Sequence, residues 1–253
     1  MNNSTSKPSL AWPTPWPNGS FRALPTALLL IVVVLPIVAF GIWEAATSAQ
    51  THVDPATLAN PVVIIASLTL TLVGEGVLAI LVLALLPWAS RLSLRELGYR
   101  ALSVRDVLVA FVGSIVMAVV ANGGASLIQW LAHTKQDQQA VVMLRSLHDP
   151  RLLLAFGVFA CVLAPLMEET IFRVFLFNAA RRRLGFWGGA IVSGVCFGLA
   201  HGDPLAALPL ALGGVILATV YYRTGNAFAS MITHGLFNSY TMLALVFAPQ
   251  LAK

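Results

Sequence analysis

Residues 152–180 read LLLAFGVFACVLAPLMEETIFRVFLFNAA, a stretch long and apolar enough to cross a membrane as one helix. Its only charged residues are Glu168, Glu169 and Arg173. A charged side chain at the bilayer centre costs roughly 2.5–3.5 kcal/mol on insertion scales, and such residues are usually paired or functional. The stretch therefore predicts both a membrane-spanning helix and a polar site inside it.

The same apolar character runs through the whole chain of 253 residues, of which 58% are hydrophobic and 10% charged. Soluble domains carry about 25% charged residues. Apolar segments of the length that spans a bilayer occur seven times, at residues 24–43, 62–88, 107–132, 152–180, 187–203, 205–222 and 226–247. We therefore predict an all-α polytopic membrane protein with about seven transmembrane helices and an intramembrane polar cavity.

The chain divides into three parts of one membrane domain. Residues 1–22 are polar and rich in proline, which predicts a flexible N-terminal tail. Residues 23–149 hold the N-terminal transmembrane helices, and residues 150–248 hold the polar clusters. The first apolar run is long for the core of a signal peptide, so we expect a retained helix. A short interfacial helix is expected within the polar segment 133–150.

Arginine residues indicate the topology. They gather between the second and third spans, after the fourth and after the sixth, at positions 91, 95, 100, 105, 181, 182, 183 and 223. The positive-inside rule then predicts a multi-pass protein of the cell membrane with its N-terminus in the cytoplasm. The net charge of +5 is accordingly attributed to topology and contact with the lipid bilayer, and we expect no nucleic-acid partner.

Two further polar clusters lie in other spans, Phe197-x-x-x-His201 and His234-x-x-x-Asn238. A helix rises 1.5 Å per residue, so Glu168, His201 and Asn238 are each about 18–21 Å from the inner ends of their spans, and His234 is about 12 Å from its own. Residues four apart share a helix face, so His234 and Asn238 are expected to face one cavity. These depths predict that the three clusters meet in a single site.

Helical spacing separates the roles of the two adjacent glutamates. Glu169 and Arg173 are four residues apart with the acid first, the favourable order for an ion pair. Glu168 points about 100° away and has no such partner, which makes it the better candidate for a general base. Phe197 is expected to pack beneath the ring of His201. Glu75, which lies between Gly74 and Gly76, is expected either to support the site or to have a structural role.

The three motifs, complete and in this order, resemble those of the CPBP intramembrane proteases, which comprise the CAAX prenyl endopeptidases and bacteriocin-processing (Abi) proteins. The resemblance covers about residues 150–245 and also allows an eight-helix bundle. It implies an intramembrane endopeptidase that hydrolyses a peptide bond in or near the bilayer, with a peptide or membrane protein as its substrate. The oligomeric state is not predicted.

Carried over by position, the resemblance implies that Glu168 and His201 activate a water molecule. His234 and Asn238 would stabilise the oxyanion, with Glu169 and Arg173 in support. A zinc ion held by Glu168, His201 and His234 is a second arrangement, as in a metalloprotease. We favour action without a cofactor or metal.

Two other functions fit the same residues. The cavity could hold the membrane segment of a partner, as in a non-catalytic scaffold or a bacteriocin-immunity protein. Chains of acidic and histidine residues also form the proton relays of transporters. However, the sequence has no inverted repeat of the transporter kind.

Overall fold

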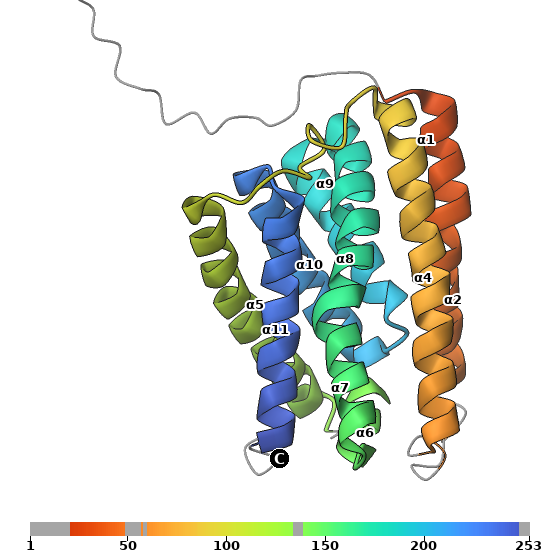
Figure 1. Ribbon diagram of the computed structural model, residues 1–253, viewed down its shortest axis with the longest axis vertical. Coiled ribbons are helices and arrows are strands. Elements are labelled where there is room, and N and C mark those ends of the chain that lie inside the picture. The colour runs from red at the N-terminus through yellow and green to blue at the C-terminus, as the bar shows by residue number, and fades with distance from the viewer. Residues whose placement is uncertain (1–20, 49–56, 58–59, 134–138, 248–253) are drawn as a thin grey trace, which may run out of the picture.

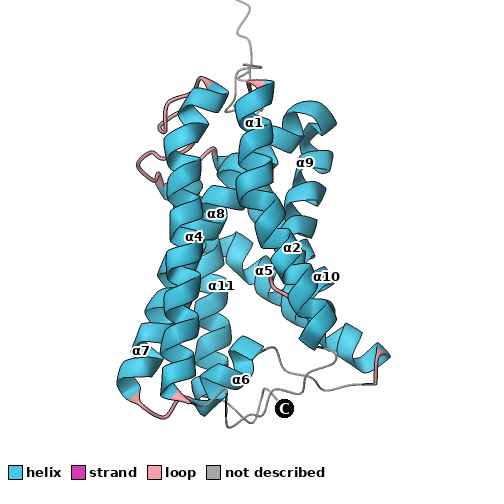
Figure 2. Ribbon diagram, turned by 90° about the vertical axis from the view of Figure 1, so that its right-hand side faces the viewer, coloured by secondary structure: helices cyan, strands magenta, loops and turns pink. Residues whose placement is uncertain are grey.

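The structure is a computed structural model that describes residues 21–48, 57, 60–133 and 139–247. Every regular element of this described part is a helix, as Figure 2 shows, which confirms the predicted all-α class. The long helices run side by side in alternating directions (Figure 1). The first span consists of α1 (Ala23–Leu29), a π-helical turn η1 (Leu30–Val34) and α2 (Leu35–Ser48).

The remaining helices follow the predicted spans closely. They are α4 (Pro61–Ser90), α5 (Val104–Leu131), α6 (Gln139–Ser146), α7 (Pro150–Val158), η2 (Phe159–Leu163), α8 (Ala164–Glu169), η3 (Thr170–Phe177), α9 (Asn178–Ala200), α10 (Pro204–Thr224) and α11 (Ala227–Phe247). The short α6 lies within the polar segment for which such a helix was expected. The flexible tail predicted for residues 1–22 falls almost entirely outside the described residues.

Five helices of the described part are long and apolar enough to cross a membrane. One of them, Pro150–Ala200, contains both the fourth and the fifth predicted spans. The chain reverses inside it at Gly185, where φ is +71° and ψ is −176°, a backbone conformation that favours glycine. The seventh predicted span forms the helix α11 but is not among the five, since its polar residues lower its hydropathy.

Local sequence signals explain where several helices begin. Ser103 and Asp106 form a capping box at the start of α5. Asp203 accepts hydrogen bonds from the backbone N–H groups of Leu205 and Ala206 at the start of α10. Pro204 occupies the first position of α10, where its missing N–H costs no helical hydrogen bond.

Small residues bring α9 and α10 together, the pair of helices with the most extensive contact in the bundle. A methyl group added at Gly198 would collide with the carbonyl oxygen of Ala207, and one at Gly194 would collide with that of Ala211. Membrane helices commonly use such positions for close backbone approach. This packing fixes the end of α9, which carries His201, against α10.

Candidate active site

A fully buried ion pair joins the first motif to the third. Arg173 Nη1 lies 3.1 Å from Glu169 Oε1, and both side chains are 0% exposed, which confirms the predicted pairing. Glu169 Oε1 is also 3.2 Å from Nδ1 of His234 on α11. Because the paired carboxylate only accepts hydrogen bonds, Nδ1 of His234 carries the proton. Glu169 therefore fixes both the tautomer and the orientation of His234.

Glu168 faces the other nitrogen of the same ring. Its Oε2 atom lies 3.8 Å from His234 Nε2, and its side chain is 14% exposed while that of Glu169 is fully buried. At 3.8 Å the two atoms are beyond hydrogen-bond distance. Among the described residues, Glu168 Oε2 has no hydrogen-bond partner. The free, partly accessible carboxylate is thus Glu168, as the helical spacing predicted.

Phe197 packs at the centre of the motif residues. Its ring makes edge contacts with the rings of His201 at 4.6 Å, His234 at 5.5 Å and Phe172 at 5.5 Å between centroids. The guanidinium of Arg173 lies 4.3 Å from the same ring, within the range of a cation–π interaction. The predicted packing of Phe197 against His201 is confirmed, and Phe197 also links the three motif helices.

His201 follows the last residue of α9 and is exposed. Its Nδ1 atom lies 2.7 Å from the carbonyl oxygen of Phe197. A carbonyl can only accept, so Nδ1 carries a proton and the free lone pair of a neutral ring is on Nε2. His201 therefore joins the group through Phe197 and keeps Nε2 available to act as a base.

Asn238 lies one turn after His234 but makes a different contact from the one predicted for it. Its amide donates a hydrogen bond of 2.7 Å to the carbonyl oxygen of Ala160 in η2. Within the π turn, Ala164 N–H bonds to Phe159, and the next donor in register would be Pro165, which has no N–H. The Asn238 amide therefore satisfies a carbonyl that the proline leaves without a helical donor.

The structure adds residues from three other elements that lay outside the motifs. Glu75 on α4 has a buried Oε2 atom without a hydrogen-bond partner among the described residues. The carboxylate of Glu44 on α2 lies against Gly202, the residue after His201. Glu44 lies just beyond the first predicted span, residues 24–43, because the hydropathy pattern does not show that α2 continues to Ser48.

Tyr99, in the loop between α4 and α5, is the third addition. Its hydroxyl lies 2.7 Å from the Thr170 hydroxyl, next to Glu169 in sequence. Thr170 donates its own proton to Leu166, so Tyr99 is the donor to Thr170. Burial raises the pKa of Tyr99 to about 12, so the phenol keeps its proton at neutral pH.

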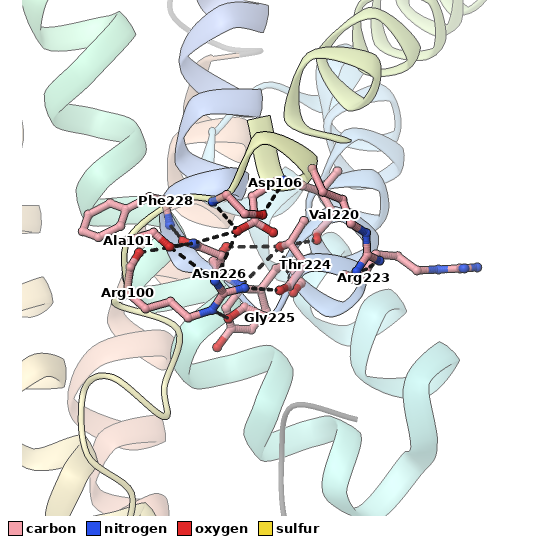
Figure 3. Close-up of polar contacts among 12 residues, drawn as sticks. Arg100, Ala101, Asp106, Val220, Arg223, Thr224, Gly225, Asn226 and Phe228 are labelled. Carbon is pink, nitrogen blue, oxygen red and sulfur yellow. Dashed lines mark hydrogen bonds and ion pairs between the residues drawn. The ribbon is translucent and has the colours of Figure 1, made fainter. Parts of the chain in front are cut away.

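A polar network at the arginine-rich end of the bundle holds α11 in place (Figure 3). Asn226, just before α11, donates through its amide to the carbonyl of Arg100 at 3.2 Å and to Asp106 at 3.3 Å. Arg100 donates to the carbonyls of Thr224 at 2.7 Å and Gly225 at 3.3 Å and pairs with Asp106 at 3.2 Å. This network fixes the register of the helix that carries His234 and Asn238.

A groove of about 500 Å³ lies beside the site, between α4 and the α7–η2 segment. It is lined mainly by apolar side chains, namely those of Leu68, Thr69, Leu72, Arg151, Leu154, Ala155, Val158, Phe159 and Leu163. Glu75 follows Leu72 by three residues on α4, so the groove leads along that helix towards the carboxyl groups.

The predicted metal ligands are not grouped as a three-ligand site. No cluster of three His, Cys, Asp or Glu side chains placed to hold one metal ion occurs in the described ranges. Glu168 and His234 face each other, whereas the His201 ring contacts Phe197. We therefore derive no chemical step through a metal, and the absence of a cofactor stays a prediction.

Comparisons with known proteins agree with the motifs. The family model for type II CAAX prenyl endopeptidase Rce1-like proteins matches residues 150–240. The chain is also 27% identical over 86 residues to the "Putative membrane peptidase YdiL" of Bacillus subtilis (strain 168), a match that covers 34% of this chain and 35% of the relative. No solved structure matches the chain significantly. The three complete motifs and these two matches support the resemblance to the CPBP family over residues 150–240, and the chain spans about a third of the length of the relative that it matches.

Proposed function

We propose that this protein is an intramembrane endopeptidase that cleaves a peptide bond in or near the bilayer with a water molecule activated by Glu168. The observation that carries the proposal is the division of labour between the adjacent glutamates. Glu169 is held by Arg173 and orients His234, while Glu168 is partly accessible, has no hydrogen-bond partner for its Oε2 atom among the described residues and lies 3.8 Å from Nε2 of the same histidine. One carboxylate that orients and another that is free to accept a proton are what general-base hydrolysis requires.

In the proposed reaction, Glu168 removes a proton from water as the oxygen attacks the peptide carbonyl, with His201 assisting through its free Nε2. His234 donates to the developing oxyanion only after its Nε2 has taken up a second proton, and the Glu169 carboxylate, which accepts from Nδ1–H, then stabilises the imidazolium. Asn238 keeps one amide N–H beyond its bond to Ala160 and could contribute a second donor. Removing one donor to an oxyanion of this kind typically lowers kcat by about 10²–10³-fold.

The groove beside α4 supports an apolar substrate that approaches from the bilayer. Its walls are mainly apolar, and its lining on α4 ends at Leu72, three residues before Glu75. We propose that the segment next to the scissile bond lies in this groove. The arginine-rich end of the bundle supports a cytoplasmic N-terminus in a cell membrane.

The test compares cells that carry the wild type with cells that carry Glu168→Gln, by proteomic detection of new peptide termini. Peptides found only with the wild type are expected, and the purified wild type, but not the variant, should generate them. Thr71→Val, an exposed change on α4, serves as a matched control that keeps the activity. If wild type and Glu168→Gln yield the same peptides while both sustain a cellular phenotype, the scaffold function replaces the protease.

Metal dependence is tested on the same purified protein. Elemental analysis is expected to show less than about 0.1 metal ion per chain, and chelation should leave cleavage unchanged. A zinc mechanism would instead require the three-ligand site to be fully occupied. One zinc ion per chain that Glu168→Gln or His234→Ala removes would instead favour the metalloprotease mechanism.

A further inference from the structure

The groove beside α4 opens on the surface of the bundle. Its volume is about 500 Å³, and its walls come from α4 on one side and from α7 and η2 on the other. The lining residues Leu72, Leu154 and Val158 are all exposed. The exposed apolar surface of a membrane-spanning helix faces lipid chains. The groove is therefore directly accessible from the bilayer.

The only charged residue of the lining lies at one end of the groove. Arg151 follows Pro150, the first residue of α7, and is exposed. Its backbone N–H donates a hydrogen bond of 2.8 Å to the capping residue Asp149. The Arg151 guanidinium has no hydrogen bond or ion pair among the described residues. The groove thus ends in a free cation at the N-terminus of a helix, and both features favour an anion.

The topology of the chain does not explain this arginine. Figure 1 places the start of α7 at the end of the bundle away from the loop between α4 and α5, which carries Arg91, Arg95 and Arg100. The positive-inside rule accounts for the arginine-rich end and gives no reason for a cation at the other end. A basic residue between membrane helices near the bilayer surface is suited to a lipid headgroup.

The length of the groove matches the thickness of one leaflet. Its longer wall extends from Arg151 to Leu163, about 18 Å along the helix at 1.5 Å per residue. The hydrocarbon core of a bilayer is about 30 Å thick, so one leaflet contributes about 15 Å. An acyl chain whose headgroup lies at Arg151 therefore reaches the end of the groove at Leu163. A protein segment would match only if its sequence placed an acidic residue at this distance.

We propose that the groove binds one acyl chain of an anionic phospholipid when no substrate is present, and that Arg151 holds the phosphate. The guanidinium donates hydrogen bonds to two phosphate oxygens, a geometry that arginine matches. The acyl chain packs against the apolar walls. The lipid belongs to the leaflet away from the arginine-rich end of the bundle.

The bound lipid then regulates the proposed peptidase. This part of the inference rests on the proposed function, in which the segment next to the scissile bond lies in the same groove. A groove of about 500 Å³ has room for one ligand of this size. Anionic phospholipid is therefore a competitive inhibitor, and a substrate has to displace it.

Lipid binding is tested without any substrate, by native mass spectrometry of the purified full-length protein. Phosphatidylglycerol should be retained about 5-fold more than phosphatidylcholine with the same acyl chains, because one cation near the membrane surface contributes about that factor. Arg151→Gln should remove this preference. Arg145→Gln, an exposed position on α6 outside the groove lining, is the control and should keep it. Equal retention of the two lipids by the wild type, or a preference that survives Arg151→Gln, overturns the inference.

The place of the acyl chain is tested by filling the groove. Ala155→Phe puts a ring into the groove and leaves every charge unchanged, so the retention of phosphatidylglycerol should fall to that of Arg151→Gln. Val73→Phe, an exposed change on α4 outside the lining, is the matched control and should have no effect. Unchanged retention in Ala155→Phe means that Arg151 attracts headgroups while no chain enters the groove, and refutes the assignment.

Competition is tested by kinetics in vesicles of phosphatidylcholine, alone or mixed with an equal amount of phosphatidylglycerol. The substrate is a synthetic peptide of zero net charge that contains the bond identified by the proteomic comparison. Phosphatidylglycerol should raise the KM of the wild type by up to about 5-fold and leave kcat unchanged. The KM of Arg151→Gln should not depend on the composition of the vesicles. If the substitution itself raises KM equally in both kinds of vesicle, Arg151 binds the substrate and the inference is overturned.

The outcomes separate this inference from the proposed function. A wild type that cleaves no peptide in either kind of vesicle refutes the proposed function, while the preference for phosphatidylglycerol and its loss in Arg151→Gln still establish the lipid site. Preferential lipid binding with an unchanged KM refutes competition, because the substrate segment then lies outside the groove.

Discussion

Replacing Arg173 by methionine should destabilise the protein by about 4 kcal/mol, within the range of 3–5 kcal/mol for breaking a buried ion pair. Arg173 and Glu169 are both 0% exposed, so the substitution leaves a carboxylate in the core without its partner. The contact of the guanidinium with the Phe197 ring, at 4.3 Å, is lost as well and accounts for up to about 2 kcal/mol of this cost. The hydrogen bond to the Gly214 carbonyl is long, at 3.4 Å, and contributes little.

The free energy of unfolding is measured in mixed micelles by reversible denaturation. Adding Glu169→Gln to Arg173→Met should recover at least half of the loss, because no unpaired charge then remains in the core. Arg95→Met, in the exposed loop after α4, is the control and should change stability by less than about 0.5 kcal/mol. A cost below about 1 kcal/mol for Arg173→Met, or additive costs in the double variant, would refute the reasoning.

Three further perturbations test separate features of the structure. Asn238→Ala should lower the free energy of unfolding by about 1–3 kcal/mol, because it leaves the Ala160 carbonyl unpaired. Pro165→Ala in that background should recover part of the loss by restoring a backbone N–H. A double variant whose loss of stability is the sum of the losses of the two single variants would contradict this assignment. Gly198→Ala should lower the free energy of unfolding by about 1–3 kcal/mol, because the added methyl group meets the backbone of α10. A denaturation midpoint that does not fall would show that α9 and α10 can move apart to accommodate the methyl group. Tyr99→Phe should lower the free energy of unfolding by about 1 kcal/mol in the same measurement, since it removes the donor to Thr170. An unchanged stability would mean that this hydrogen bond makes no net contribution to folding.

The sequence was sufficient to predict the transmembrane helices, because the length of each apolar segment indicates the length of the span. Local residue types also explain structural details, such as Pro204 at the first position of α10 and the glycines that let α9 and α10 approach closely. The pairing of Glu169 with Arg173 followed from helical spacing alone, since both residues lie on one face of one helix. Contacts of this kind depend only on local geometry.

Contacts between helices could not be obtained in that way. Helical spacing placed Asn238 on the same face as His234, yet its amide bonds to the Ala160 carbonyl. That carbonyl lacks a helical donor because of a π turn and a proline in another span. The residue pattern of the helix that carries Asn238 does not reveal either feature. The position of Glu44 could not be predicted for a similar reason. It depends on the length of α2 and on how α2 packs against the end of α9.

The sequence by itself determined that the chain is a helical membrane protein, roughly where its spans lie, and which polar residues are candidates for its chemistry. Only the tertiary structure decided which of these residues touch. It joined Glu169 to His234, placed Glu168 3.8 Å from the other nitrogen of that ring and left Glu168 Oε2 without a hydrogen-bond partner among the described residues. The physical reason is that hydropathy and helical period act along one helix, whereas the protonation of buried groups depends on the neighbours that packing supplies.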